Sequence, residues 1–194
     1  MTASDVPQHL RANRSGFTRW FGRTLLNAMG WQVEGRIPDL KKFIVAGAPH
    51  TSNWDFVIAM AVVMACDIKA NWLAKHTIFV FPFKRLFFAL GGIPLDRGNT
   101  KGIAEQIAEK IRDSEQLVIG IMPEGTRSKV EKWKSGFLRI AHKAGCPVLL
   151  ASLDFKHKRI CFGDLIEARE DTDQQLVEIK NYYRQFQPKY PEKF

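Results

Sequence analysis

A histidine and a carboxylate lie five positions apart in the chain, at His50 and Asp55. A histidine whose ring is oriented by a carboxylate can act as a general base, because the carboxylate fixes the tautomer and stabilises the imidazolium that forms. Two residues of one helix at this spacing lie about 140° apart around the axis. The side chains can therefore meet only if His50 precedes the helix and folds back, so we expect His50 in a loop and Asp55 in the following helix.

The same segment has a second interpretation. Ser52 and Asp55 have the spacing of a capping box, in which the carboxylate only accepts hydrogen bonds from the backbone of the first helical turn. His50 would then be an ordinary loop histidine. The spacing by itself leaves both interpretations open.

Further segments follow in order along the chain: Gly92, Ile93 and Arg97; Pro-Glu-Gly-Thr-Arg-Ser at residues 123–128; and Cys-Pro-Val at residues 146–148. Together with His50 and Asp55 they span residues 50–153, and they resemble the sequence blocks of the glycerophospholipid acyltransferase family, which includes the 1-acylglycerol-3-phosphate acyltransferases. Pro94 and Met122 depart from the family pattern, which has a bulky apolar residue and a Phe there. Neither departure removes a polar group, so both bear on the substrate more than on the chemistry.

The resemblance implies transfer of a fatty acyl group from acyl-CoA or acyl-carrier protein to a hydroxyl of a lysophospholipid-type acceptor, with lysophosphatidic acid as the leading candidate. His50 would be the base and Asp55 its orienting acid. The implied substrate-binding residues, several of them on the acceptor phosphate, are Arg97, Glu124, Gly125, Thr126, Arg127, Asn53 and Lys134. Guanidinium groups suit phosphate oxygens, whereas Glu124 is anionic and is assigned to orienting Arg97 or Arg127, with a structural salt bridge as the alternative.

The sequence indicates direct transfer rather than a covalent intermediate. It contains no Gly-x-Ser-x-Gly segment, and no cysteine is marked as a nucleophile by its neighbours. We expect no metal and no cofactor other than the acyl donor as co-substrate. The three cysteines have no metal-binding spacing, and the first residues lack the apolar region of a signal peptide, so we expect a reducing, cytosol-facing location.

The net charge of +9 predicts an anionic partner. Residues 127–160 carry nine basic side chains against two acidic ones, a local +7 next to the third sequence block. No signature of a nucleic-acid-binding fold is present, so a phosphorylated acceptor and an anionic membrane surface explain the charge better than nucleic acid does. A lyso-aminolipid acceptor, a non-enzymatic basic module that binds membranes or nucleic acid, and a merely solvated basic face are the alternatives.

Residues 15–30 have the pattern of an amphipathic helix that begins after Ser15 and stops at Gly30. Helical spacing gathers one apolar side, formed by Phe17, Trp20, Phe21, Leu25, Ala28 and Met29, with Arg19 and Arg23 opposite. Such a helix lies either in a membrane interface or against a protein core. We predict a membrane-associating segment at residues 1–30, an acyltransferase domain at residues 31–194, and peripheral attachment to the cytoplasmic side of the cell membrane. The most apolar window, residues 56–66, is too short to span a bilayer.

The remaining pattern predicts an α/β fold: a mixed, largely parallel sheet flanked by helices, with the N-terminal amphipathic helix added to it. Strands are expected at residues 31–35, 43–48, 71–74, 117–121, 147–153 and 159–162, and helices at residues 56–64, 103–111, 136–143 and 173–185. The blocks at residues 92–97 and 122–128 are each expected just after a strand. Five phenylalanines within residues 79–88 exceed what one strand or helix usually presents. They belong either to the core, to a surface that contacts lipid, or to the wall of a groove for the acyl chain.

Overall fold

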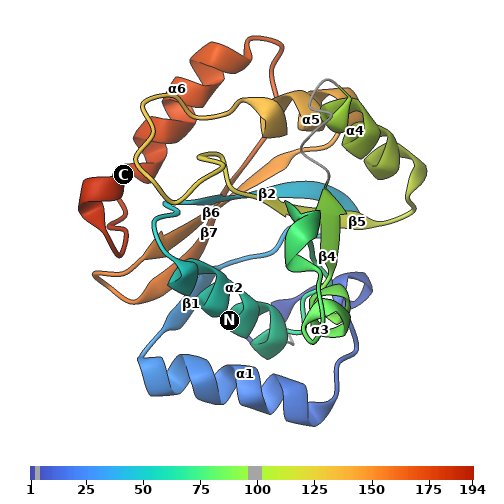
Figure 1. Ribbon diagram of the computed structural model, residues 1–194, viewed down its shortest axis with the longest axis vertical. Coiled ribbons are helices and arrows are strands. Elements are labelled where there is room, and N and C mark those ends of the chain that lie inside the picture. The colour runs from blue at the N-terminus through green and yellow to red at the C-terminus, as the bar shows by residue number, and fades with distance from the viewer. Residues whose placement is uncertain (3–4, 96–101) are drawn as a thin grey trace.

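The computed structural model describes residues 1–2, 5–95 and 102–194 (Figure 1). Within these residues, seven strands form one sheet in the order β1-β7-β6-β2-β5-β3-β4. The strands are β1 (Gln32–Gly35), β2 (Lys42–Ala48), β3 (Asn71–Lys75), β4 (Gly92–Leu95), β5 (Leu117–Ile121), β6 (Val148–Asp154) and β7 (Arg159–Ile166). The strands from β6 to β4 run parallel, and β7 is antiparallel to β6. The sheet is thus mixed and largely parallel, as the sequence predicts.

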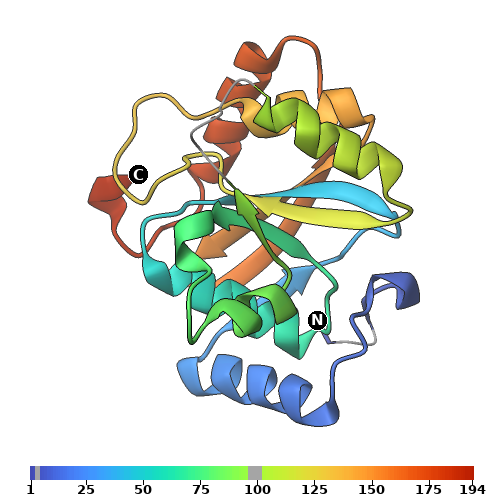
Figure 2. The same cartoon turned by 45° about the vertical axis from the view of Figure 1, so that its right-hand side comes forward.

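Helices cover both faces of this sheet. They are α1 (Gly16–Met29), α2 (Asn53–Ala65), α3 (Lys84–Ala89), α4 (Ile103–Asp113), α5 (Gly136–Ala144) and α6 (Thr172–Tyr183), with short 3₁₀ helices at Gln8–Leu10, His76–Ile78 and Pro191–Lys193. Figures 1 and 2 both show α1, α2 and α3 on one side of the sheet and α4, α5 and α6 on the other. The chain therefore folds as a three-layer α/β sandwich.

The central strands supply two separate apolar clusters. In β2, Ile44 and Ala46 belong to the cluster that contains buried side chains of α4, α5 and α6, whereas Phe43 belongs to the cluster that contains those of α1 and α2. Successive side chains of a strand point to opposite faces, so a nearly continuous apolar strand is needed when both faces are covered. This explains why β2, β5 and β6 are apolar almost throughout.

The strand, loop and helix around His50 are arranged as predicted: β2 ends at Ala48 and α2 begins at Asn53. One prediction was wrong, because residues 92–95 do not follow a strand but form the edge strand β4 itself, paired with β3. The apolar residues that precede them, which we read as strand-like, form α3 and its C-terminal end. Short apolar runs do not distinguish a strand from a short helix.

The N-terminal helix α1 has the predicted ends, since the Ser15 side chain accepts a hydrogen bond from the Thr18 amide and Gly30 adopts a left-handed conformation with φ of 72°. It packs on α2 through Gly22 and Leu26. Much of the predicted apolar side nevertheless faces outward: 72% of Phe17, 54% of Trp20 and 47% of Phe21 are exposed.

The two predicted sides of α1 therefore need a correction. Arg19 lies against the protein, where it pairs with the buried Asp67 at 3.7 Å, rather than on the solvent side. The boundary expected after residue 30 falls between α1 and β1, and Val6, Leu10 and Leu26 on its N-terminal side are buried in the same cluster as Phe43. No helix in the described part of the chain is both long and apolar enough to cross a bilayer.

The phenylalanine-rich run is divided between the core and the surface. Phe79 is buried and stacks on Trp72 with 5.9 Å between ring centroids, so this part of the run belongs to the core. Phe81 is 93% exposed, and Phe83 and Phe88 are about half exposed. The second part of the run is therefore an aromatic surface around α3.

Candidate active site

His50 and Asp55 meet at the carboxyl end of β2. The Nδ1 atom of His50 lies 3.0 Å from Oδ2 of Asp55, so Nδ1–H donates to the carboxylate. The remaining ring nitrogen, Nε2, then carries the lone pair that can accept a proton. Asp55 is fully buried, while 17% of the His50 side chain is exposed, so the ring can be reached from solvent and its partner cannot.

Asp55 also caps α2, so both interpretations of the sequence hold at once. Its Oδ2 atom accepts hydrogen bonds from the amides of Thr51 and Ser52, each at 2.8 Å, in addition to the bond from His50. The Ser52 hydroxyl in turn accepts a bond from the Trp54 amide at 3.0 Å. One oxygen thus orients the ring and fixes the loop that carries it.

Glu124 lies beside this pair because β5 is the sheet neighbour of β2 and both strands end at the same edge. The chain leaves β5 through a turn in which the Gly125 amide bonds the Met122 carbonyl. Glu124 is only 4% exposed, and its Oε1 accepts a hydrogen bond from the backbone N–H of His50 at 2.8 Å. Burial raises the pKa of Glu124 to about 7, and the nearby Asp55 acts in the same direction, while hydrogen bonds from the backbone oppose the shift.

Of the two arginines that Glu124 was expected to orient, only Arg127 belongs to the described residues. Within the described residues Glu124 forms no ion pair, and its Oε2 is buried without a hydrogen-bond partner. Arg127 is exposed and is not bonded to it. Arg97, the other predicted partner, lies outside the described residues. The carboxyl group instead holds the backbone of His50, a contact between residues 74 positions apart that local spacing cannot reveal.

The other residues of the third block form an open turn close to His50. Gly125 has φ of +66°, a left-handed conformation that favours glycine, and the side chain of Lys134 crosses it so closely that a Cβ there would lie 3.1 Å from the lysine Cδ. The Lys134 amide bonds the Pro123 carbonyl, and the Thr126 hydroxyl accepts a bond from the Ser128 amide at 3.4 Å. The structure thus brings Lys134 to the same turn as Arg127, and both are exposed cations.

Asn53 is the first residue of α2, and its side chain is exposed beside the His50 loop. No local sequence pattern points to the C-terminal residues that also reach this loop. The Tyr190 amide donates to the Thr51 hydroxyl at 3.3 Å, and the Lys189 ammonium lies 4.7 Å from the centre of the Trp54 ring. Because these pairs are more than 130 positions apart, only the tertiary fold brings them together.

A second histidine and aspartate are in contact at the turn between β6 and β7, where Nδ1 of His157 lies 2.7 Å from Oδ2 of the buried Asp154. The same oxygen accepts a bond from Arg159, and Arg159 also pairs with Glu34 of β1. These hydrogen bonds connect β1, β6 and β7. We therefore interpret this cluster as structural.

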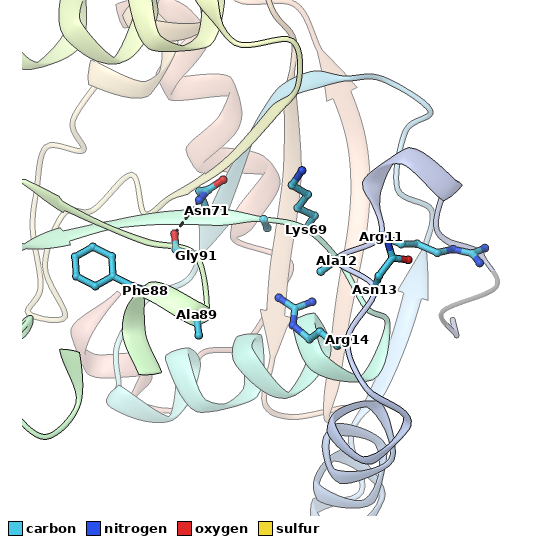
Figure 3. A pocket seen from close by; sticks show the side chains of 10 residues that line it. Arg11, Ala12, Asn13, Arg14, Lys69, Asn71, Phe88, Ala89 and Gly91 are labelled. Carbon is cyan, nitrogen blue, oxygen red and sulfur yellow. Dashed lines mark hydrogen bonds between the residues drawn. The ribbon is translucent and has the colours of Figure 1, made fainter. Parts of the chain in front are cut away.

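A cavity of about 340 Å³ lies at the end of the sheet opposite to His50, where strands β3 and β4 begin (Figure 3). The Arg14 side chain on its wall donates to the carbonyls of Val63 and Ile68 and pairs with Asp67, while Asn71 donates to the Gly91 carbonyl. These bonds tie the N-terminal segment to the end of α2 and join the starts of two strands. The cavity is thus remote from His50, and Arg14 and Asn71 on its wall serve the fold.

The arrangement at the β2 and β5 edge is suited to removing a proton from a hydroxyl group. The His50 ring is partly exposed, the Asp55 carboxylate that it contacts is buried, and the cations Arg127 and Lys134 lie on the neighbouring turn. Within the described residues, no group of three or more His, Cys, Asp or Glu side chains is placed to hold a metal ion.

Comparison with known proteins agrees with this geometry. The sequence model of the family described as Acyltransferase matches residues 31–152, a range that contains His50, Asp55 and the turn after β5. The search of the curated proteins finds no match. Among solved structures, the chain is similar to PlsC, the 1-acyl-sn-glycerophosphate (LPA) acyltransferase of Thermotoga maritima, with a TM-score of 0.64 and 19% identity over 87% of this chain and 76% of that one. At this identity the similarity establishes the fold.

Proposed function

This chain belongs to the acyltransferase family, and on that premise we propose that it transfers a fatty acyl group from acyl-CoA or acyl-carrier protein to a hydroxyl of a lysophospholipid-type acceptor, with lysophosphatidic acid as the leading candidate. The observation that carries the proposal is the 3.0 Å contact between His50 and the buried Asp55. The name of the similar protein PlsC supports the choice of acceptor.

In the proposed reaction His50 acts as general base. Its Nε2 takes the proton of the acceptor hydroxyl while the oxygen attacks the carbonyl carbon of the acyl thioester. Asp55 holds the tautomer and stabilises the imidazolium. When the tetrahedral intermediate collapses, the carbon–sulfur bond breaks and the proton passes from His50 to the sulfur, which leaves as a free thiol. Donor and acceptor must therefore be bound together, and no acyl-enzyme forms.

We assign the acceptor phosphate to the turn after β5. Arg127 supplies a planar guanidinium, Lys134 adds a second cation, and Gly125 exposes backbone close to both. Thr126 shapes the turn, and we assign Asn53, exposed at the start of α2, to substrate binding as well. Arg97 is retained from the sequence, although it lies outside the described residues.

The proposal is tested by measuring thiol release from acyl-CoA and acyl-carrier protein with a panel of acceptors. We expect transfer to a phosphorylated lysolipid, and a loss of about 10²- to 10⁴-fold in His50→Ala. Equal turnover in wild type and a correctly folded His50→Ala variant would refute the mechanism.

The acceptor is tested separately with Arg127→Lys, which keeps the charge and loses the guanidinium fork. We expect kcat/KM for the phosphorylated acceptor to fall roughly 10-fold, while the KM of the donor changes little. A better rate with a phosphate-free acceptor, such as a lyso-aminolipid, would move the arginine to the phosphates of the donor.

The same proposal includes peripheral attachment to the anionic, cytoplasmic side of the cell membrane. Supporting it, α1, α2 and α3 lie on one side of the sheet (Figures 1 and 2). These helices and the segment that leads into α3 expose large apolar side chains. These are Phe17, Trp20, Phe21, Trp54, Val57, Ile78, Val80, Phe81, Phe83, Leu86 and Phe88. Arg23, Lys84 and Arg85 are exposed among them. Exposed aromatic side chains with neighbouring cations suit the interface of an anionic bilayer.

A further inference from the structure

Glu124 is a buried acid with a single bonded oxygen. Its side chain is 4% exposed, Oε1 accepts the His50 amide at 2.8 Å, and Oε2 is buried with no hydrogen-bond partner among the described residues. Burying a carboxyl group costs free energy unless it is fully paired, and an apolar residue would fill the same space more favourably. The one hydrogen bond that this carboxyl group accepts from another described residue is therefore the best indication of its use.

That contact fixes the base from a second direction. Asp55 holds the ring of His50 through Nδ1, whereas Glu124 holds the backbone from which the ring projects. The two carboxyl groups come from different elements, α2 and the turn after β5. With the backbone and the ring both bonded, Nε2 has a defined position at the sheet edge.

The turn that carries Glu124 also carries the cations assigned to the acceptor. Gly125 follows it directly, the Lys134 side chain crosses Gly125, and the Lys134 amide bonds the Pro123 carbonyl. A phosphate bound by Arg127 and Lys134 would restrain this turn. Any restraint on the turn reaches His50 through the bond between Glu124 and the His50 amide.

We propose that Glu124 is a positioning residue that acts on His50 through its backbone and couples occupancy of the acceptor-phosphate turn to placement of the base, without touching either substrate. This inference rests on the proposed function. It predicts that hydrogen-bond acceptance at Oε1 is what matters, so glutamine can replace glutamate and alanine cannot. It also predicts that the loss appears in kcat rather than in KM for the acceptor.

The test compares Glu124→Ala and Glu124→Gln with wild type, using Glu131→Ala as a matched control from the exposed part of the same loop. We expect Glu124→Ala to lower kcat roughly 10- to 100-fold, since misplacing a catalytic group by about 1 Å has an effect of this size, with acceptor KM within about 3-fold of wild type. Glu124→Gln should regain most of the lost kcat. Glu131→Ala should match wild type.

Coupling is tested with two acceptors that differ only in the phosphate. In wild type the phosphorylated acceptor should have the higher kcat, and in Glu124→Ala the two values of kcat should converge. A large rise in acceptor KM with kcat retained would overturn the proposal in favour of substrate contact. Equal losses of kcat in the glutamine and alanine variants would show that the charge, not the hydrogen bond, is required.

A measurement independent of activity uses the ¹H–¹⁵N signal of the His50 amide. It should shift on adding glycerol 3-phosphate to wild type, and the shift should be much smaller in Glu124→Ala, with folding checked by circular dichroism. An unchanged response in the variant would contradict the coupling. Failure of the proposed function would appear differently, as no acyl transfer by wild type with any acceptor.

Discussion

Replacement of Asp55 by asparagine tests whether one oxygen serves both catalysis and folding. In wild type, Oδ2 accepts hydrogen bonds from the His50 ring and from the amides of Thr51 and Ser52 at 2.8 to 3.0 Å. The other oxygen, Oδ1, is buried and has no partner among the described residues. With its oxygen in the place of Oδ2, asparagine turns three charge-assisted bonds into neutral ones and leaves its NH₂ group, in the place of Oδ1, without an acceptor. With its NH₂ group in the place of Oδ2, it loses the bonds from the amides of Thr51 and Ser52.

Each of these effects can be given a size. A hydrogen bond to a charged group contributes about 1 kcal/mol more than a neutral one, and a buried unpaired donor costs about 1–3 kcal/mol. Because neighbouring contributions are not additive, we expect a total loss of about 2–4 kcal/mol, or roughly 5–15 °C in Tm for a chain of this length. An amide that donates to Nδ1 would also place the proton on Nε2 and remove the base, so kcat should fall about 10²- to 10⁴-fold.

The matched control is Ser52→Ala, which removes the acceptor of the Trp54 amide but leaves the contact between His50 and Asp55. It should lower stability by about 1 kcal/mol and keep kcat near the wild-type value. Thermal unfolding and thiol release, measured on both variants, separate the two roles. Wild-type turnover in a destabilised Asp55→Asn protein would mean that Asp55 only caps the helix and that His50 does not need it as an orienting acid.

Three further predictions concern other parts of the molecule. Burial raises the pKa of Glu124 from 4.5 to about 7, so its contribution to stability is complete below about pH 4.5 and is lost as the pH rises through 7. In denaturant titrations the free energy of unfolding of wild type should fall by about 3 kcal/mol between these two pH values. The same fall in Glu124→Gln would show that Glu124 is not its cause. A Cβ on Gly22 would lie 2.6 Å from a backbone nitrogen of α2, so Gly22→Ala should lower the free energy of unfolding by about 1–3 kcal/mol, more than the gain in helix propensity. Gly16 has open space around it, so Gly16→Ala should not lower the stability of the protein in the same thermal unfolding experiment. Replacing Phe17 and Phe81 together by serine should weaken the affinity for anionic vesicles, measured by sedimentation, by about 10-fold or more, whereas Val177→Ser, exposed on α6, should have no effect. Equal binding by wild type, the double variant and Val177→Ser would mean that another surface contacts the membrane.

Much of the fold is encoded locally. Apolar runs predicted β2, β5 and β6, helical periodicity predicted α1 and α4, and most boundaries lie within three residues of those observed. These features depend on neighbours in the sequence, through side-chain alternation, helical spacing and caps such as Ser15 and Gly30. The wrong prediction at β4 also comes from local pattern alone, because the short apolar run before β4 is compatible with a helix as well as with a strand.

The contact between His50 and Asp55 was predictable from the sequence, since the two residues are joined by a single loop whose geometry their spacing restricts. Their spacing could not separate orienting from capping, and the tertiary structure shows that Oδ2 does both. The partner of Glu124 could not be predicted at all. It depends on β5 lying next to β2, a matter of strand order and register that is decided by how the whole sheet packs between its two layers of helices. The same holds for the aromatic side chains of α1, whose exposure follows from the side of the helix that α2 occupies. Local spacing encodes the helices and strands and the meeting of side chains within one segment, whereas the contact between residues 74 positions apart and the choice of the exposed helix face depend on how the sheet and its helices pack.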